Sequence, residues 1–156
     1  MSDDTPYPEL MRKIGTDAGL LFLRVSFGLL MFAGHGLGKM ERFHTISNPD
    51  FHFADPFGLG PATSFILAGM AEGVASMLIV LGLGTRLVAI PLVFTMCVAV
   101  FHAHGGDPMF GKPPSKELAM LFGSAFAAIL MLGPGRLSLD HLLAGVWKRR
   151  REARAG

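Results

Sequence analysis

Ionisable side chains occur inside the apolar stretches of this chain, where they are expensive. Residues 20–40, LLFLRVSFGLLMFAGHGLGKM, contain Arg24, His35 and Lys39. A charged side chain at the centre of a membrane helix costs about 2.5–3.5 kcal/mol on insertion scales. On a helix, these three residues share one stripe with Gly28 and Met31, because the intervals are four, three, four and four residues. We expect this stripe to face other helices or a water-filled cleft.

The remaining apolar stretches supply the ionisable residues Glu72, Arg86, His102, His104 and Glu117. An unperturbed imidazole titrates at about pH 6.5, so histidine can transfer protons, while Arg and Lys can stabilise negative charge. The candidate catalytic residues are therefore His35, His102 and Glu117. The candidate cofactor-binding residues are Arg24, Lys39, Glu72 and Arg86. An interfacial polar cluster with no chemistry is the alternative.

Opposite charges are available for pairing. Arg24 and Glu72 lie about seven and eleven residues from the cytoplasmic ends of their expected spans, a difference of about 6 Å along a helix axis. We expect them to be partners, directly or through water. The alternative role for such a pair is purely structural, fixing the register of two helices.

Metal and thiol chemistry have weaker support. His102 and His104 form an H-x-H pair that is a weak metal-ligand signal, because alternating positions on a helix point apart. The single cysteine, Cys97, excludes an internal disulfide relay, which needs a pair of thiols. We expect Cys97 to be a small buried apolar residue.

The elements that position these residues are predicted by hydrophobicity. Hydrophobic residues make up 51% of the 156 residues, charged residues 17%, and the mean hydropathy is +0.46. The apolar residues form four blocks, each long enough to cross a hydrocarbon core of about 30 Å. The sequence therefore predicts an all-α integral membrane four-helix bundle in one domain, residues 1–156, with spans at 17–38, 61–83, 86–103 and 117–133.

Charge outside the spans predicts the orientation. Nine Lys and Arg residues fall on the side of the two termini and four on the opposite side, so we expect both termini to be cytoplasmic. The tail contains Trp147 and the basic run KRRREAR. It predicts a short interfacial helix over about residues 138–152, with Ser138 as N-cap, held by anionic lipid rather than by nucleic acid.

Two long connections join the spans on the opposite side. The first connection carries the aromatic residues Phe43, Phe51, Phe53 and Phe57. We favour an aromatic belt at the membrane interface, and the alternative is that these rings cover the mouth of the bundle.

Several motifs resemble the DoxX family of small bacterial membrane proteins. They are LLFLRVSFGLLMFAGHGLGKM, GMAEGVASMLIVLGLGTRL, the His102 region and KELAMLFGSAFAAILMLGPGRLSLD, which together cover most of residues 20–140. The resemblance implies a four-helix bundle in the bacterial cytoplasmic membrane. It also implies redox associations, since relatives include a subunit similar to thiosulfate:quinone oxidoreductase and members linked to oxidative-stress complexes. The motif residues carried over by position are Arg24, His35, Lys39, Glu72, Arg86, His102 and Glu117.

Two classes of function follow. The chain is a redox enzyme or enzyme subunit with a quinone or small oxidisable molecule between its helices, or a non-catalytic membrane module that binds a metal, a lipid or a partner enzyme. Because the sequence has neither a haem-attachment motif nor a nucleotide fingerprint, an electron carrier has to be a quinone, a metal or a partner, such as a soluble redox enzyme or another membrane subunit.

Overall fold

A computed structural model describes residues 7–155, and the regular structure within this range is entirely helical. Within these residues the helical segments join into five continuous rods. Their segments are α1 (Tyr7–Met31), η1 (Phe32–Gly36), α2 (Leu37–Glu41) and η2 (Arg42–Ser47); α3 (Pro61–Gly69), η3 (Met70–Ala75) and α4 (Ser76–Leu81); α5 (Thr85–Val98) and η4 (Ala99–Ala103); α6 (Glu117–Leu132); and α7 (Leu139–Ala155).

Three of these rods are long and apolar enough to cross a membrane. They are Met11–Ser47 with 37 residues, Pro61–Leu81 with 21 and Thr85–Ala103 with 19. The fourth apolar helix, α6, has 16 residues, or about 24 Å at 1.5 Å per residue, which is shorter than a full hydrocarbon core. The expected all-α membrane protein is confirmed in this coarser form, and the helix boundaries lie close to the predicted ones except at the ends of the first rod.

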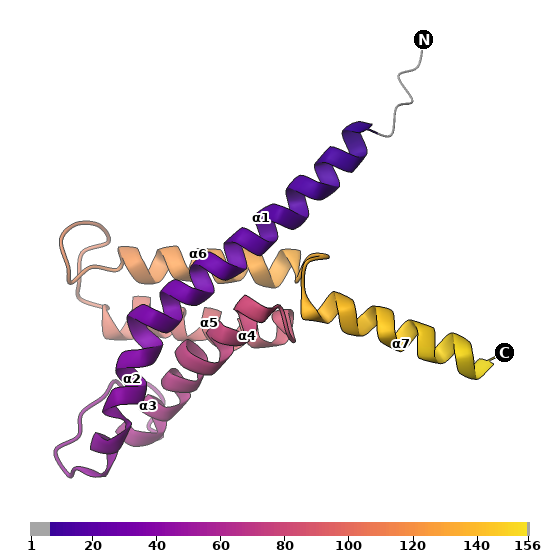
Figure 1. The fold of residues 1–156 in the computed structure, drawn as a ribbon. Coiled ribbons are helices and arrows are strands. Elements are labelled where there is room, and N and C mark those ends of the chain that lie inside the picture. Colours follow the sequence, from indigo (N-terminus) through magenta and orange to yellow (C-terminus); the bar gives the residue numbers. More distant parts are fainter. Residues whose placement is uncertain (1–6, 156) are drawn as a thin grey trace.

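The helices form a bundle with two distinct ends. Figure 1 shows the connections 48–60 and 104–116 at one end, which we call the loop end, and the short turns 82–84 and 133–138 at the other, the turn end. The described parts of both chain termini extend from the turn end. Helices α5 and α6 run side by side, and α1 packs against α4 and α6. A bundle of this shape places residues of several helices around one loop-end mouth.

The predicted stripe on the first rod is confirmed as its inward face. Arg24, Gly28 and Met31 are buried, and His35 and Lys39 are half-buried. Gly28 allows α4 to approach closely, since a Cβ at this position would lie 2.9 Å from the carbonyl oxygen of residue 76. Polar side chains are costly where they face lipid, which explains why this face of the rod turns toward the other helices.

Two local predictions have opposite outcomes. Ser138 is confirmed as the N-cap of α7, because its hydroxyl accepts a hydrogen bond from the His141 amide at 3.2 Å. The prediction for Cys97 is wrong: its side chain is exposed on the outer surface of α5. In a membrane bundle, an apolar surface facing lipid costs nothing, so hydrophobicity does not report burial there.

Candidate functional site

A cavity of about 630 Å³ opens at the loop end of the bundle. Its walls come from the first three rods, and part of the first long connection covers it. Most of the lining is apolar, including Ala68, Phe94, Met96 and Val98. Four ionisable residues also line it, and these are His35, Lys39, Glu72 and His104. An apolar cavity with a few convergent polar groups is the usual form of a small-molecule site.

Three π-helical turns surround this cavity, one from each long rod. They are η1, η3 and η4, and each contributes lining residues. A π-helical turn is rare and occurs frequently at functional sites, because the widened turn displaces side chains from the regular helical stripe. In this chain, His35 lies in η1, Glu72 lies in η3, and His104 directly follows η4. Two of the turns therefore place an ionisable side chain in the cavity wall, and the third turn is directly followed by one.

Close backbone contact fixes the register between the first two rods. A Cβ added at Gly36 would lie 2.8 Å from the carbonyl oxygen of Glu72 and 2.9 Å from the Cα of Gly73. Real Cβ atoms essentially never come this near to backbone atoms, so glycine is needed there. The contact brings His35 and Lys39, which flank Gly36, next to Glu72.

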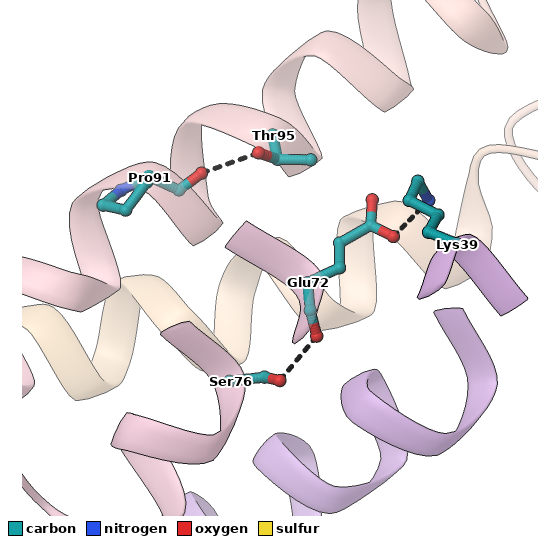
Figure 2. Close-up of polar contacts among 5 residues, drawn as sticks. All are labelled: Lys39, Glu72, Ser76, Pro91 and Thr95. Carbon is teal, nitrogen blue, oxygen red and sulfur yellow. Dashed lines mark hydrogen bonds and ion pairs between the residues drawn. The ribbon is translucent and has the colours of Figure 1, made fainter. Parts of the chain in front are cut away.

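Lys39 and Glu72 form an ion pair in the cavity wall (Figure 2). Their side chains are 17% and 8% exposed, so the charges are largely removed from water. The carbonyl oxygen of Glu72 accepts a hydrogen bond from the Ser76 hydroxyl, which links the π-helical turn η3 to the first residue of α4. Removing two charges from water costs free energy, and this cost is offset only when the two charges interact closely with each other.

The predicted partnership of Arg24 and Glu72 is therefore wrong. The guanidinium of Arg24 donates instead to the carbonyl oxygens of Ile79, at 3.4 Å, and Leu137, at 2.5 Å. Both acceptors lie at the turn end. Glu72 faces Gly36, twelve residues farther along α1 and η1 than Arg24, which corresponds to about 18 Å of helix. The depth comparison failed because Arg24 lies level with Gly82, at the end of the second rod, so the residues of α1 before Arg24 extend past that end and add no depth.

Arg24 belongs to a network at the turn end. Gly82 has φ +68°, and a Cβ there would overlap the guanidinium of Arg24. The carboxylate of Asp140 accepts hydrogen bonds from the amides of Gly84 at 2.7 Å and Thr85 at 2.9 Å. Burial acts to raise the pKa of Asp140, but these hydrogen bonds and the charge of Arg24 hold it below its ordinary value. The network joins α1, the turn before α5 and the start of α7.

His35 and His104 have different supports at the cavity. The half-buried ring of His35 meets Phe122 of α6 edge-to-face, with ring centroids 5.8 Å apart. Nδ1 of His104 lies 2.7 Å from a carboxylate oxygen of Asp107. A carboxylate at Nδ1 favours the tautomer whose Nε2 is free to accept a proton. Each imidazole is thus oriented by a neighbour.

The first connection forms the roof of the cavity. The rings of Phe51 and Phe53 both meet Phe65 edge-to-face at 5.2 Å, and Phe57 stacks on Phe94 at 5.6 Å. Phe53 and Phe57 line the cavity. Phe53 and Phe57 therefore cover the cavity, as the mouth-covering alternative expects, whereas the aromatic ring at position 43 lies outside the lining.

Asp55 fastens this roof to the start of α3. Its carboxylate accepts hydrogen bonds from the amides of Leu59 and Gly60 and from the hydroxyl of Ser64, at 2.8–2.9 Å. Burial acts to raise the pKa of Asp55, but these hydrogen bonds outweigh it and hold the pKa below its ordinary value. The roof is therefore a fixed part of the fold at neutral pH.

The other predicted site residues lie away from the cavity. His102 and Glu117 are exposed and outside its lining. Glu117 occupies the first turn of α6, where a negative charge complements the helix dipole. Arg86 is exposed and donates to the carbonyl oxygen of Met131, at the end of α6, at 3.3 Å. Arg24 donates to a carbonyl oxygen near the end of α4, and Arg86 donates to one near the end of α6, so both have structural partners outside the cavity.

The expected H-x-H metal pair has no supporting ligand cluster. Within residues 7–155, no three His, Cys, Asp or Glu side chains are grouped so that they could hold a metal ion. His104 turns to Asp107 and the cavity, and His102 stays on the surface. Neither the different positions of these two histidines nor the structural role of Asp55 was predicted from the sequence. The one available signal for Asp55 was its position before the Gly-Pro step that begins α3.

Comparison with known proteins agrees with this architecture. The sequence model of the DoxX family matches residues 19–105, more than half of the chain. An uncharacterized protein of Haemophilus influenzae is 32% identical over 126 residues, covering 78% of this chain and 88% of that protein. An uncharacterized membrane protein of Mycobacterium tuberculosis is 31% identical over 140 residues, covering 81% of this chain and 76% of that protein. No solved structure matches the chain significantly. This multi-pass membrane protein belongs to the DoxX family.

Proposed function

We propose that this DoxX-family membrane protein binds a quinone, or another small oxidisable molecule of similar polarity, in the loop-end cavity and serves as an oxidoreductase or oxidoreductase subunit. The observation that carries the proposal is the convergence of three π-helical turns on one apolar cavity that contains a buried ion pair. A helical bundle can pack without π-helical turns and without a buried ion pair. Such a pair is a weak source of stability.

The cavity lining suits both the flat ring of a quinone and its carbonyl oxygens. Aromatic side chains such as Phe53 and Phe94 offer flat apolar surface to a ring. The ammonium of Lys39 and the imidazole of His35 offer hydrogen-bond donors to carbonyl oxygens, and Nε2 of His104 becomes a donor once it has taken up a proton. Reduction of a quinone to the hydroquinone consumes two electrons and two protons. The histidines supply protons, Lys39 stabilises developing negative charge, and a partner redox protein supplies the electrons.

The cavity is also accessible to a lipid-soluble molecule. Phe57, Leu67 and Phe94 line the cavity and are also more than half exposed, at 59%, 53% and 54%, so the cavity is open beside them. In a bilayer this surface faces acyl chains. An apolar tail can therefore lie between α3 and α5 while the polar ring reaches Lys39, so the ligand enters from the membrane.

The membrane arrangement that accompanies this function is a four-span bundle in the bacterial cytoplasmic membrane, formed by one domain over residues 1–156. In it, α6 is the fourth span, α7 lies at the interface, and both termini are cytoplasmic. The nine-to-four excess of Lys and Arg on the side of the termini supports this orientation. Reporter fusions after residues 50 and 110 should be extracytoplasmic and a C-terminal fusion cytoplasmic. A cytoplasmic reporter at residue 50 would overturn the orientation.

Ligand retention tests the function. The protein is purified in native lipid, and bound small molecules are quantified by mass spectrometry with metal analysis. We expect a stoichiometric quinone in the wild type and its loss in Glu72→Gln and His35→Ala. Glu117→Gln and His102→Ala are matched controls, since they change the same residue types outside the cavity and should retain it. An empty wild type that copurifies with a soluble enzyme would instead support the non-catalytic module.

A further inference from the structure

The last helix presents an apolar face that the bundle does not cover. Figure 1 shows α7 leading away from the turn end of the bundle. Five of its apolar side chains are 37–71% exposed, and they are Leu139, Leu142, Leu143, Val146 and Trp147. Their spacing of i, i+3, i+4, i+7 and i+8 places them on one face of a helix. A contiguous exposed apolar face marks an interaction surface.

The same face becomes basic in the second half of α7. At 100° per residue, which follows from about 3.6 residues per turn, Arg150 and Arg154 continue the line of the apolar face. Together with Trp147 and Arg151 they line a surface groove of about 590 Å³. Lys148 and Glu152 lie on the opposite side of the helix. The face therefore combines an apolar stripe with a row of guanidinium groups.

The start of α7 is fixed to the bundle, so its position relative to the membrane is restricted. Asp140 accepts hydrogen bonds from the amides at positions 84 and 85, and its own amide donates to the carbonyl oxygen of Gly82 at 2.9 Å. The carbonyl oxygen of Leu137 accepts from Arg24. These contacts hold the first turn of α7 against the turn end of the bundle.

We propose that α7 lies on the bilayer and is a binding site for the phosphate-bearing headgroups of anionic phospholipids. The apolar stripe enters the boundary between headgroups and acyl chains, and the guanidinium groups bind the phosphates. Charge complementarity selects this occupant. Residues 148–154 carry five cationic side chains and one carboxylate, so a second copy of α7 would bring like charges together. The proposal does not depend on the ligand in the cavity.

Trp147 is the only tryptophan of the chain, so its fluorescence reports on α7 alone. The full-length protein is reconstituted in vesicles of phosphatidylcholine, with and without phosphatidylglycerol. With phosphatidylglycerol we expect emission at shorter wavelength, quenching by brominated acyl chains and protection from acrylamide. Added salt should weaken the protection, because at about 1 M the screening length is only about 3 Å. Equal exposure to acrylamide in both vesicles would overturn the proposal.

A matched pair of variants tests the face itself. Each cation near an anionic surface contributes about 1 kcal/mol, or about a fivefold change in the docking equilibrium. Arg150→Gln should weaken docking by about this factor and Arg150→Gln with Arg154→Gln by about the square of it. Lys148→Gln removes the same charge from the opposite face and should have a smaller effect. Equal effects of the two single variants, or salt-independent protection in lipid-free detergent, which indicates docking on protein, would refute anionic-lipid binding.

Discussion

Breaking the Lys39–Glu72 ion pair should destabilise the protein asymmetrically. Lys39→Met leaves the carboxylate of Glu72, whose side chain is 8% exposed, without its partner. Removing one member of a buried pair costs about 3–5 kcal/mol, and we expect the lower end because the cavity beside Glu72 admits some solvent. Glu72→Gln keeps a hydrogen-bond acceptor and leaves an ammonium that can turn into the cavity. Its cost should be about 1–2 kcal/mol.

The double variant separates a real pair from two independent effects. With both charges removed, no charge is buried alone, so the cost should fall short of the sum of the single costs by about 1–2 kcal/mol. The free energy of unfolding is measured in mixed micelles by reversible denaturation with SDS. An additive cycle would refute the pairing.

A second cycle serves as the control. Arg24→Met and Glu72→Gln should be additive within about 0.5 kcal/mol, because the two residues are far apart along the bundle and have different hydrogen-bond partners among residues 7–155. Coupling in this cycle, with none between Lys39 and Glu72, would restore the pairing expected from sequence and contradict the register set by Gly36.

Two further predictions concern the contacts that frame the site. Gly36→Ala should destabilise the protein by about 1–3 kcal/mol, because the new methyl group meets the backbone of Glu72. Gly34→Ala, where a Cβ meets nothing within 4 Å, should be neutral or stabilising in the same unfolding assay, and equal losses would contradict the close approach. The lowered pKa of Asp140 means that its stabilising contribution is present above the unfolded value of about 3.8 and is lost as pH falls through the lower folded value. Asp140→Asn should cost about 1–2 kcal/mol at neutral pH and make acid unfolding less steep, and an unchanged acid transition would be evidence against this role.

Hydrophobicity and spacing were sufficient to predict the helices and the inward stripe. A charge in a lipid-facing position is so costly that Arg24 and His35 had to face inward, and the structure confirms this. The N-cap at Ser138 followed from an equally local rule. Such features depend on neighbouring residues of one helix, which the sequence displays directly.

The pairing between helices was not predictable in the same way. It depends on the register between two helices, which is set by the close contact of Gly36 with the backbone of Glu72. Gly36 is one of many glycines in the chain. The π-helical turns also rotate the residues that follow them out of the regular pattern, so His104 reaches the cavity while His102 does not. No local signal distinguished these two histidines.

Photolabelling with an azide-bearing benzoquinone in native-lipid discs tests the central claim most directly. We predict saturable labelling of peptides from α3, η3 and α5 that line the cavity, and its loss in Ala68→Phe, which fills the space. Ala33→Phe, at an exposed position of η1, should label like the wild type. Label spread over the lipid-facing surface and unchanged by Ala68→Phe would contradict a quinone site in the cavity.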